Sequence, residues 1–249
     1  MDKKSQIAVF IIIGIVILAA VLFFLYFRQI SASSERVSPI DTAPFDSFVS
    51  SCLDSTSKDA VVYVGQHGGF FELPTGSDEI LKLPYYLKED KLSWPSKNQV
   101  ENELAKYVDS ELRFCLENFR SFKGVAVDFD ASKTTSLVYD RKIIFSTDFP
   151  ITIKQGSATA KLDKFNSEVN TKLGTIINVT DSYMQIQKND TSTICISCLL
   201  DLVNKNNLSI NLGNVENSTF VFTITDKEIP RESNKYEYSF LMQYNFGAK

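Results

Sequence analysis

Four cysteines are the residues of this 249-residue chain whose chemistry depends most on spacing. Cys195 and Cys198 form a C-x-x-C pair, a spacing found in zinc sites, in redox-active thiols and in structural disulfides. A tetrahedral zinc ion would need two further ligands, and the chain contains a single histidine, His67. We therefore expect a disulfide or redox pair at this position rather than a zinc site.

A redox-active pair needs its first cysteine at the N-terminus of a helix, where the helix dipole lowers the thiol pKa. Thr193 is placed to cap such a helix, so Cys195 and Cys198 are compatible with an envelope thiol oxidoreductase. The βαβ pattern that surrounds this motif in thioredoxin-like proteins is missing, however. A structural disulfide or a reduced core pair is therefore the favoured interpretation.

Cys52 and Cys115 are the second candidate pair. Each lies on the apolar stripe of its own predicted helix, so both side chains are expected to point into the protein. If the two helices pack together outside the cytoplasm, a disulfide can form and persist. It would close a loop of about 60 residues and add about 3–4 kcal/mol of stability in the chain-entropy model. Two unlinked buried cysteines are the alternative.

Two other groups of residues have spacings that occur in ligand sites. The turn 65–69 lacks the phosphate-binding and dinucleotide-binding spacings, and glycines that permit positive φ explain it. His67 is accordingly expected to be a surface turn residue. Asp128 and Asp130 share one face of a predicted strand, as ligands of a divalent cation would, but carboxylates are also common where strands end. We prefer the second explanation.

Composition and charge exclude several classes of protein. The chain is 44% hydrophobic and 12% aromatic, which is too apolar for a disordered protein. Its formal net charge of −4 argues against a nucleic-acid-binding protein, because such a protein needs a basic face. No nucleophile elbow, HExxH, EF-hand or P-loop motif occurs. We therefore expect no enzyme, no cofactor, and no catalytic, cofactor-binding or metal-binding residues.

Hydrophobic periodicity predicts two helices before residue 124 and mostly strands after it. A helix is expected over 45–64, ended by Gly65, and a second one from Ser96, its capping residue, to about 119. Strands are expected at 70–74, 84–87, 125–129, 137–139, 143–145, 151–153, 158–162, 220–224 and 236–244, turns at 140–141 and 148–150, and helices at 169–184 and 194–202. This order predicts an α+β fold with a mainly antiparallel sheet and flanking helices.

An uncharged apolar segment near the start of the chain predicts a transmembrane helix whose partner is the lipid bilayer. Ile7–Phe27 would be about 30 Å long as a helix, the thickness of a bilayer core. A cleaved signal peptide is the alternative, although its apolar core is usually only about 7–15 residues long. Lys3 and Lys4 favour a cytoplasmic N-terminus. The chain is thus expected in the cell membrane as a single-pass protein.

The polypeptide is expected to have three parts. Residues 1–28 are the signal-anchor, and residues 29–44, rich in serine and proline, are a flexible tether. Residues 45–249 form an extracytoplasmic α+β domain, which has a candidate subdivision near residue 124.

The opening residues Lys3-Lys4-Ser5-Gln6-Ile7 and the apolar run after them resemble those of uncharacterised archaeal single-span membrane proteins. Further matching positions are Cys52-Leu53, the Gly-Gln-x-Gly-Gly-aromatic turn Gly65–Phe70, Tyr85-Tyr86, Cys115-Leu116 and Phe149-Pro150. The resemblance covers most of the chain and brings no activity or catalytic residues with it. It implies a membrane-anchored extracytoplasmic protein with a role in binding, scaffolding or envelope structure.

The same opening is similar to the class III signal of archaeal pilins and archaellins. In that family a peptidase cuts before the glutamine, here between Ser5 and Gln6, and the apolar helix packs in a filament core. Phe10 stands where the family has a glutamate, and Pro39 and Pro44 interrupt the helix. We therefore rank a type IV pilin-like subunit, processed before Gln6, second among the hypotheses and the thiol oxidoreductase third.

Overall fold

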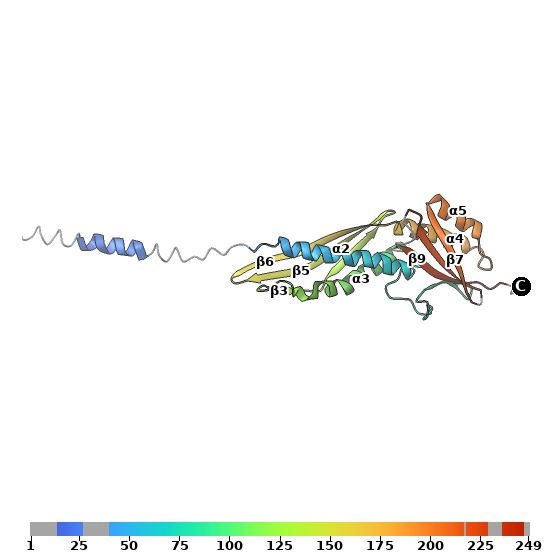
Figure 1. Cartoon of the computed structure of the whole chain (residues 1–249), viewed down its shortest axis with the longest axis horizontal. Helices are drawn as coiled ribbons and strands as arrows, with labels where there is room; N and C mark the ends of the chain where they lie inside the picture. The colour runs from blue at the N-terminus through green and yellow to red at the C-terminus, as the bar shows by residue number, and fades with distance from the viewer. Residues whose placement is uncertain (1–13, 27–39, 217, 229–235, 247–249) are drawn as a thin grey trace, which may run out of the picture.

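The computed structural model describes residues 14–26, 40–216, 218–228 and 236–246. Residues 14–26 form a helix drawn apart from an elongated folded body (Figure 1). In the part of the chain that the structure describes, no helix has the length and hydropathy of a membrane span. Both ends of the predicted span Ile7–Phe27 lie outside the described residues.

One half of the body is a long antiparallel sheet of four strands. Strand β5 (Lys142–Gln155) runs through its centre, and β6 (Ala158–Asn170) pairs along almost the whole of one edge. The other edge of β5 pairs with two shorter strands, β3 (Ala126–Phe129) and β4 (Lys133–Val138). Alternate residues of β4 and β5 are buried, so one face of this sheet packs on the core.

Two helices, α2 (Ala43–Gln66) and α3 (Lys97–Leu116), cover that inner face (Figure 1). The helix α3 begins at the predicted capping residue, Ser96, whose hydroxyl oxygen accepts a hydrogen bond from the amide of Gln99. After α3 a short 3-10 turn, η1 (Glu117–Phe119), leads into the sheet. These elements bury the apolar stripes that the sequence places on both helices.

The other half of the body is a second, five-stranded sheet in the order β2-β1-β9-β8-β7. Its strands are β1 (Tyr85–Lys88), β2 (Lys91–Leu92), β7 (Leu208–Glu216), β8 (Thr219–Asp226) and β9 (Glu237–Gln243). The pair β1–β9 is parallel and the other pairs are antiparallel. The predicted α+β class with mainly antiparallel sheet is therefore confirmed.

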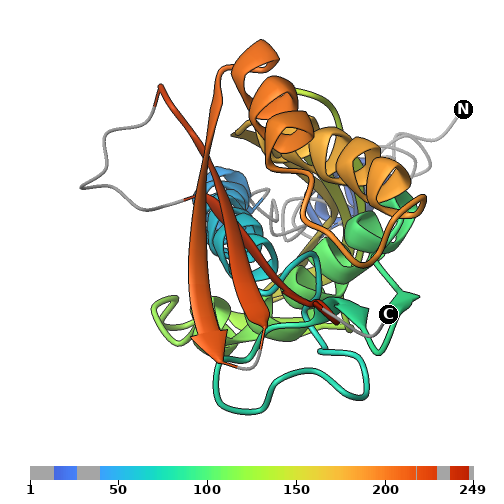
Figure 2. The same ribbon diagram turned by 90° about the vertical axis from the view of Figure 1, so that its right-hand side faces the viewer.

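Helices α4 (Leu173–Gln187) and α5 (Ile196–Lys205) lie against one face of this second sheet (Figure 2). On that face the ring of Phe240 stacks between Tyr86 and Phe222, at centroid distances of 4.2 and 5.3 Å. The ring of Tyr183 packs on Phe222 from α4. One continuous cluster of buried apolar side chains joins the two halves of the body.

Several predicted boundaries are wrong. Residues 70–74 form an irregular loop rather than a strand. The amides of Phe71 and Glu72 donate hydrogen bonds, each of 3.1 Å, to the buried carboxylate of Glu103 instead of to a neighbouring strand. The predicted turn at 148–150 lies inside β5, where the pairing with β6 shifts register. The strands β4 and β3 pair with β5 on either side of Pro150, and neither pairs with Pro150 itself. Pro150 has no amide hydrogen, but its position therefore removes no hydrogen bond between strands.

Two further differences concern the later part of the chain. Val169 belongs to β6, since α4 starts only at Leu173. The strand β7 was not predicted at all. It is the edge strand of the second sheet, and its residues beyond Leu208 are mostly exposed, so its sequence lacks a clear alternation of apolar and polar residues.

Candidate functional site

Both candidate cysteine pairs are disulfide-bonded, and none of the four cysteines is free. Cys52 on α2 and Cys115 on α3 have their Cα atoms 5.6 Å apart. The expectation that both side chains point inward is only half right: Cys52 is buried, whereas Cys115 is exposed beside the buried stripe of α3. The bond therefore links the two helices at the border of their contact rather than inside it.

Cys195 and Cys198 lie at the surface, at the start of α5. Cys195 is the residue that precedes the first turn, and its carbonyl oxygen accepts the amide of Leu199 at 3.2 Å. The predicted capping role of Thr193 is wrong, because its hydroxyl donates instead to Asp190 at 2.7 Å. The first cysteine itself thus occupies the helix N-terminal position that a redox-active pair requires.

The loop before Cys195 is held by polar side chains. Gln187, which is buried, donates its amide to the carbonyl oxygens of Asp190 and Thr193. The carboxylate of Asp190 accepts hydrogen bonds from the amide and hydroxyl of Ser192, at 2.9 and 2.7 Å, and from the hydroxyl of Thr193. The Ser192 hydroxyl is the main cause that lowers the pKa of Asp190 to about 2. None of these contacts uses a cysteine sulfur.

Apolar side chains stand next to this disulfide. Ile196, between the two cysteines, has 50% of its surface exposed, and Leu200, one turn later on α5, has 44% exposed. Leu199 and Val203, which adjoin them on the same side of the helix, are buried in the core. The disulfide and two exposed aliphatic residues therefore share the first two turns of one helix.

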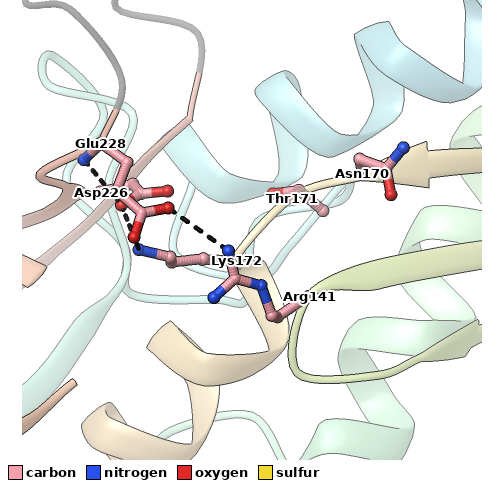
Figure 3. A pocket seen from close by; sticks show the side chains of 6 residues that line it. All are labelled: Arg141, Asn170, Thr171, Lys172, Asp226 and Glu228. Carbon is pink, nitrogen blue, oxygen red and sulfur yellow. Dashed lines mark hydrogen bonds and ion pairs between the residues drawn. The ribbon is translucent and has the colours of Figure 1, made fainter. Parts of the chain in front are cut away.

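A second candidate site is a polar pocket of about 400 Å³ where the two sheets meet (Figure 3). It is lined by Arg141, Asn170, Thr171, Lys172, Asp226 and Glu228. The ammonium of Lys172 lies 2.7 Å from Asp226 and 3.2 Å from Glu228, and Arg141 lies 3.3 Å from Glu228. Two cations therefore face two carboxylates, and the charges of the pocket compensate one another.

The electrostatics of the pocket favour fixed charges over proton transfer. The hydrogen bond from Lys172 is the main cause that lowers the pKa of Glu228 below its usual value, and the amide of Asn207 acts in the same direction. A carboxylate that stays ionised in this way is a poor general base near neutral pH. No sequence motif pointed to this pocket, because its residues come from segments far apart in the chain.

The turn 65–69 has a structural explanation. Gly68 and Gly69 have φ values of +58° and +82°, as predicted for this turn. The hydroxyl of Tyr86 donates to the carbonyl of Gly68 at 2.8 Å and lies 2.7 Å from the hydroxyl of Tyr238. The Nδ1 atom of His67 lies 2.7 Å from the carbonyl oxygen of Tyr63, and the two rings stack. The turn therefore closes the end of α2 onto the second sheet.

The carboxylates of the first sheet are not brought together with other ligands. Asp128 forms an ion pair with Lys154 at 2.6 Å, across the β3–β5 pair. Asp130 follows the end of β3, where its amide donates to the carbonyl of Pro150 at 3.2 Å. Within the described residues, no three His, Cys, Asp or Glu side chains are grouped as metal ligands.

Comparisons with protein-family models, with curated proteins and with solved structures find no match to this chain. A function has to be inferred from the side chains of this protein.

Proposed function

We propose that this protein is a single-pass membrane protein that holds an α+β domain outside the cytoplasm, where it acts in binding, scaffolding or envelope structure. The observation that carries the proposal is that all four cysteines are paired in disulfides. Disulfides persist in oxidising compartments and are rare in a reducing cytosol. A domain built with two of them fits the exported side of a membrane.

The apolar segment at Ile7–Phe27 supplies the anchor in this proposal. Its described part, residues 14–26, is helical, and its large apolar side chains are exposed: Leu18, Leu22 and Phe24 each have at least 60% of their surface accessible. So much contiguous apolar surface is unfavourable in water and favourable among lipid chains. The acidic residues of the chain lie almost entirely after this segment, which suits a domain that stays in water.

A role in binding or scaffolding is supported by the outer face of the first sheet. Among the described residues, α2 and α3 cover one face of this sheet, and the residues of β4 that point the other way are exposed. Among them Leu137 has 53% of its surface exposed, and Tyr139, just after the strand, has 48%. Exposed aromatic and aliphatic residues on a rigid sheet are suited to contact a partner.

Protease treatment of intact cells tests the proposal. We expect added protease to degrade the domain while the membrane is closed, and the protein to fractionate with membranes. On gels, the oxidised and reduced forms should differ in mobility, and Cys52→Ala/Cys115→Ala should remove most of that difference. Protection of the domain in intact cells, or recovery in the soluble fraction with residues 1–30 intact, would contradict the proposal.

The same preparation distinguishes the pilin-like alternative. Mass spectrometry of the mature chain should find the N-terminal segment uncut. If Gln6 is instead the first residue, a peptidase has processed the chain between Ser5 and Gln6, and a pilin-like subunit becomes the better hypothesis.

A further inference from the structure

We propose that the Cys195–Cys198 disulfide is a redox-active site that oxidises pairs of cysteine thiols in other, incompletely folded polypeptides. The inference goes beyond the membrane-anchored role and does not depend on it. It rests on three observations: the position of the two sulfurs, the small loss of stability expected when their bond is reduced, and the apolar side chains beside them.

The first argument is the position of Cys195. It directly precedes α5, a helix of 10 residues. The unpaired amides at a helix N-terminus stabilise a negative charge, and a cysteine thiolate in this position has a lowered pKa. The hydroxyl of Ser197, 3.8 Å from the Cys195 sulfur, is a further donor for such a thiolate. Because the thiolate is stabilised, Cys195 is a good leaving group, which makes the disulfide oxidising.

The second argument compares the two disulfides. Cys52 and Cys115 are 63 residues apart, so their bond restricts a large part of the unfolded chain, and its reduction must destabilise the fold. Cys195 and Cys198 are only 3 residues apart, so their bond restricts little. The loop before them is held by Gln187 and Asp190 without either sulfur. After reduction, the two thiols should therefore stay in the same positions, and the fold should lose little stability.

The third argument identifies the class of substrate. Both cysteines are partly exposed, and Ile196 and Leu200 present aliphatic surface beside them. Unfolded chains expose apolar residues around their free cysteines, whereas folded proteins bury most of them. The surface around this disulfide thus favours a peptide thiol with apolar neighbours over a small hydrophilic thiol.

The reaction is a thiol–disulfide exchange in two steps. A substrate thiolate attacks the Cys195 sulfur, a bond forms between these two atoms, and the Cys198 sulfur leaves as a thiolate that takes up a proton. The second substrate thiolate then attacks the substrate sulfur of this mixed disulfide, and Cys195 leaves as a thiolate. The substrate loses two electrons and gains a disulfide, and the protein is left with the dithiol.

Equilibration of the full-length protein in glutathione buffers is the first test. The probes are reduced and oxidised glutathione, followed by alkylation and mass spectrometry of each cysteine. The quantity compared is the squared concentration of reduced glutathione divided by the concentration of oxidised glutathione, because two glutathiones are consumed and one oxidised glutathione is released for each disulfide reduced. We expect Cys195–Cys198 to be half reduced at a value of this quantity at least tenfold lower than Cys52–Cys115 needs. If both disulfides are half reduced at the same value, or Cys195–Cys198 needs the higher one, the proposal is wrong.

Single-cysteine variants test the assigned roles of the two sulfurs. In Cys198→Ser, the remaining Cys195 should react with oxidised glutathione at pH 6 at least tenfold faster than Cys198 does in the matched variant Cys195→Ser. Equal rates would show that the helix N-terminus does not activate Cys195 and would overturn the mechanism. Alkylation at a series of pH values should give Cys195 a lower midpoint than Cys198.

A reduced peptide with two cysteines and apolar flanking residues tests the substrate class. We expect wild-type protein to convert it to the disulfide form with one equivalent of Cys195–Cys198 consumed. The variant Ile196→Ser/Leu200→Ser should oxidise the peptide several-fold more slowly than wild type. Ile80→Ser, which alters a side chain with 92% of its surface exposed on a distant loop, is the matched control. Equal slowing by both variants, or no oxidation by wild type, would refute the assignment.

Discussion

The ammonium of Lys172 lies 2.7 Å from the carboxylate of Asp226, and the exposed fractions of the two side chains are only 6% and 7%. Lys172 follows the last strand of the first sheet, and Asp226 ends β8 of the second sheet. This buried ion pair therefore connects the two halves of the body. Its partner Glu228 is half exposed and reaches the same ammonium from the solvent side.

Replacement of Lys172 by methionine should destabilise the protein strongly. The substitution leaves the buried carboxylate of Asp226 without its cation, and breaking one side of a buried pair typically costs about 3–5 kcal/mol. Urea unfolding followed by circular dichroism measures the loss. Lys172→Met/Asp226→Leu, which removes both charges, should recover part of it. Lys142→Ala is the surface control: its pair with Glu168 is about half exposed, so the loss should stay under about 1 kcal/mol.

Gly174 in the first turn of α4 should not tolerate a side chain. A Cβ atom there would overlap the carbonyl group of Tyr139, in the turn between β4 and β5. Because backbone atoms cannot move aside, Gly174→Ala is expected to cost about 1–3 kcal/mol in thermal or urea unfolding. Gly213→Ala is the matched control, since no atom lies within 4 Å of its Cβ position. Equal losses for both variants would contradict the predicted overlap.

Loss of the Cys52–Cys115 bond should cost about 4 kcal/mol of unfolding free energy, because a loop of this length is closed in the unfolded chain. Cys52→Ala/Cys115→Ala, compared with wild type in urea, measures it. The Cys195–Cys198 bond closes only a very short loop, so Cys195→Ser/Cys198→Ser should lose less than about 2 kcal/mol. The reverse order of the two losses would show that the stabilising disulfide is the one on α5.

The carboxyl group of Asp190 should stay ionised to unusually low pH. Its pKa is lowered from 3.8 to about 2 by the hydroxyl and amide of Ser192 and the hydroxyl of Thr193. Because the folded-state pKa is the lower one, the stabilisation is complete above pH 3.8 and is lost as the pH falls toward 2. NMR titration of this carboxyl measures the midpoint. Ser192→Ala should raise it, whereas Ser110→Ala, far along the chain, should leave it unchanged.

The sequence predicted the elements whose signals are local. The helix α3 was recognised because Ser96 caps it and because Leu104, Val108 and Leu112 repeat on one side. The pairing of Cys52 with Cys115 followed from two helices that both needed to bury an apolar stripe. The exposure of Cys115 did not follow, since it depends on how far α3 is rotated against its neighbour, which the periodicity does not specify.

The features that the sequence did not reveal depend on contacts between distant segments. The sequence predicts a strand at 70–74, because nothing local indicates that Glu103 accepts hydrogen bonds from the amides of this stretch. The same reason applies to the polar pocket: Lys172 and Asp226 are 54 residues apart, so no local pattern pairs them, and charged residues are in general expected on the surface. The sequence predicts Cys195 close to the N-terminus of a helix, but it places the start of that helix at residue 194, before the observed start of α5 at Ile196.

The helix α2 is the first element of the folded body, so a pull on the chain before residue 40 is transmitted to the body through this helix. Such a load would unwind α2 from Ala43 toward its C-terminal end. At Cys52 the covalent link passes the force to α3 and halts the unwinding before most of α2 has been extracted. The bond would therefore share tension applied from the N-terminal side between α2 and α3.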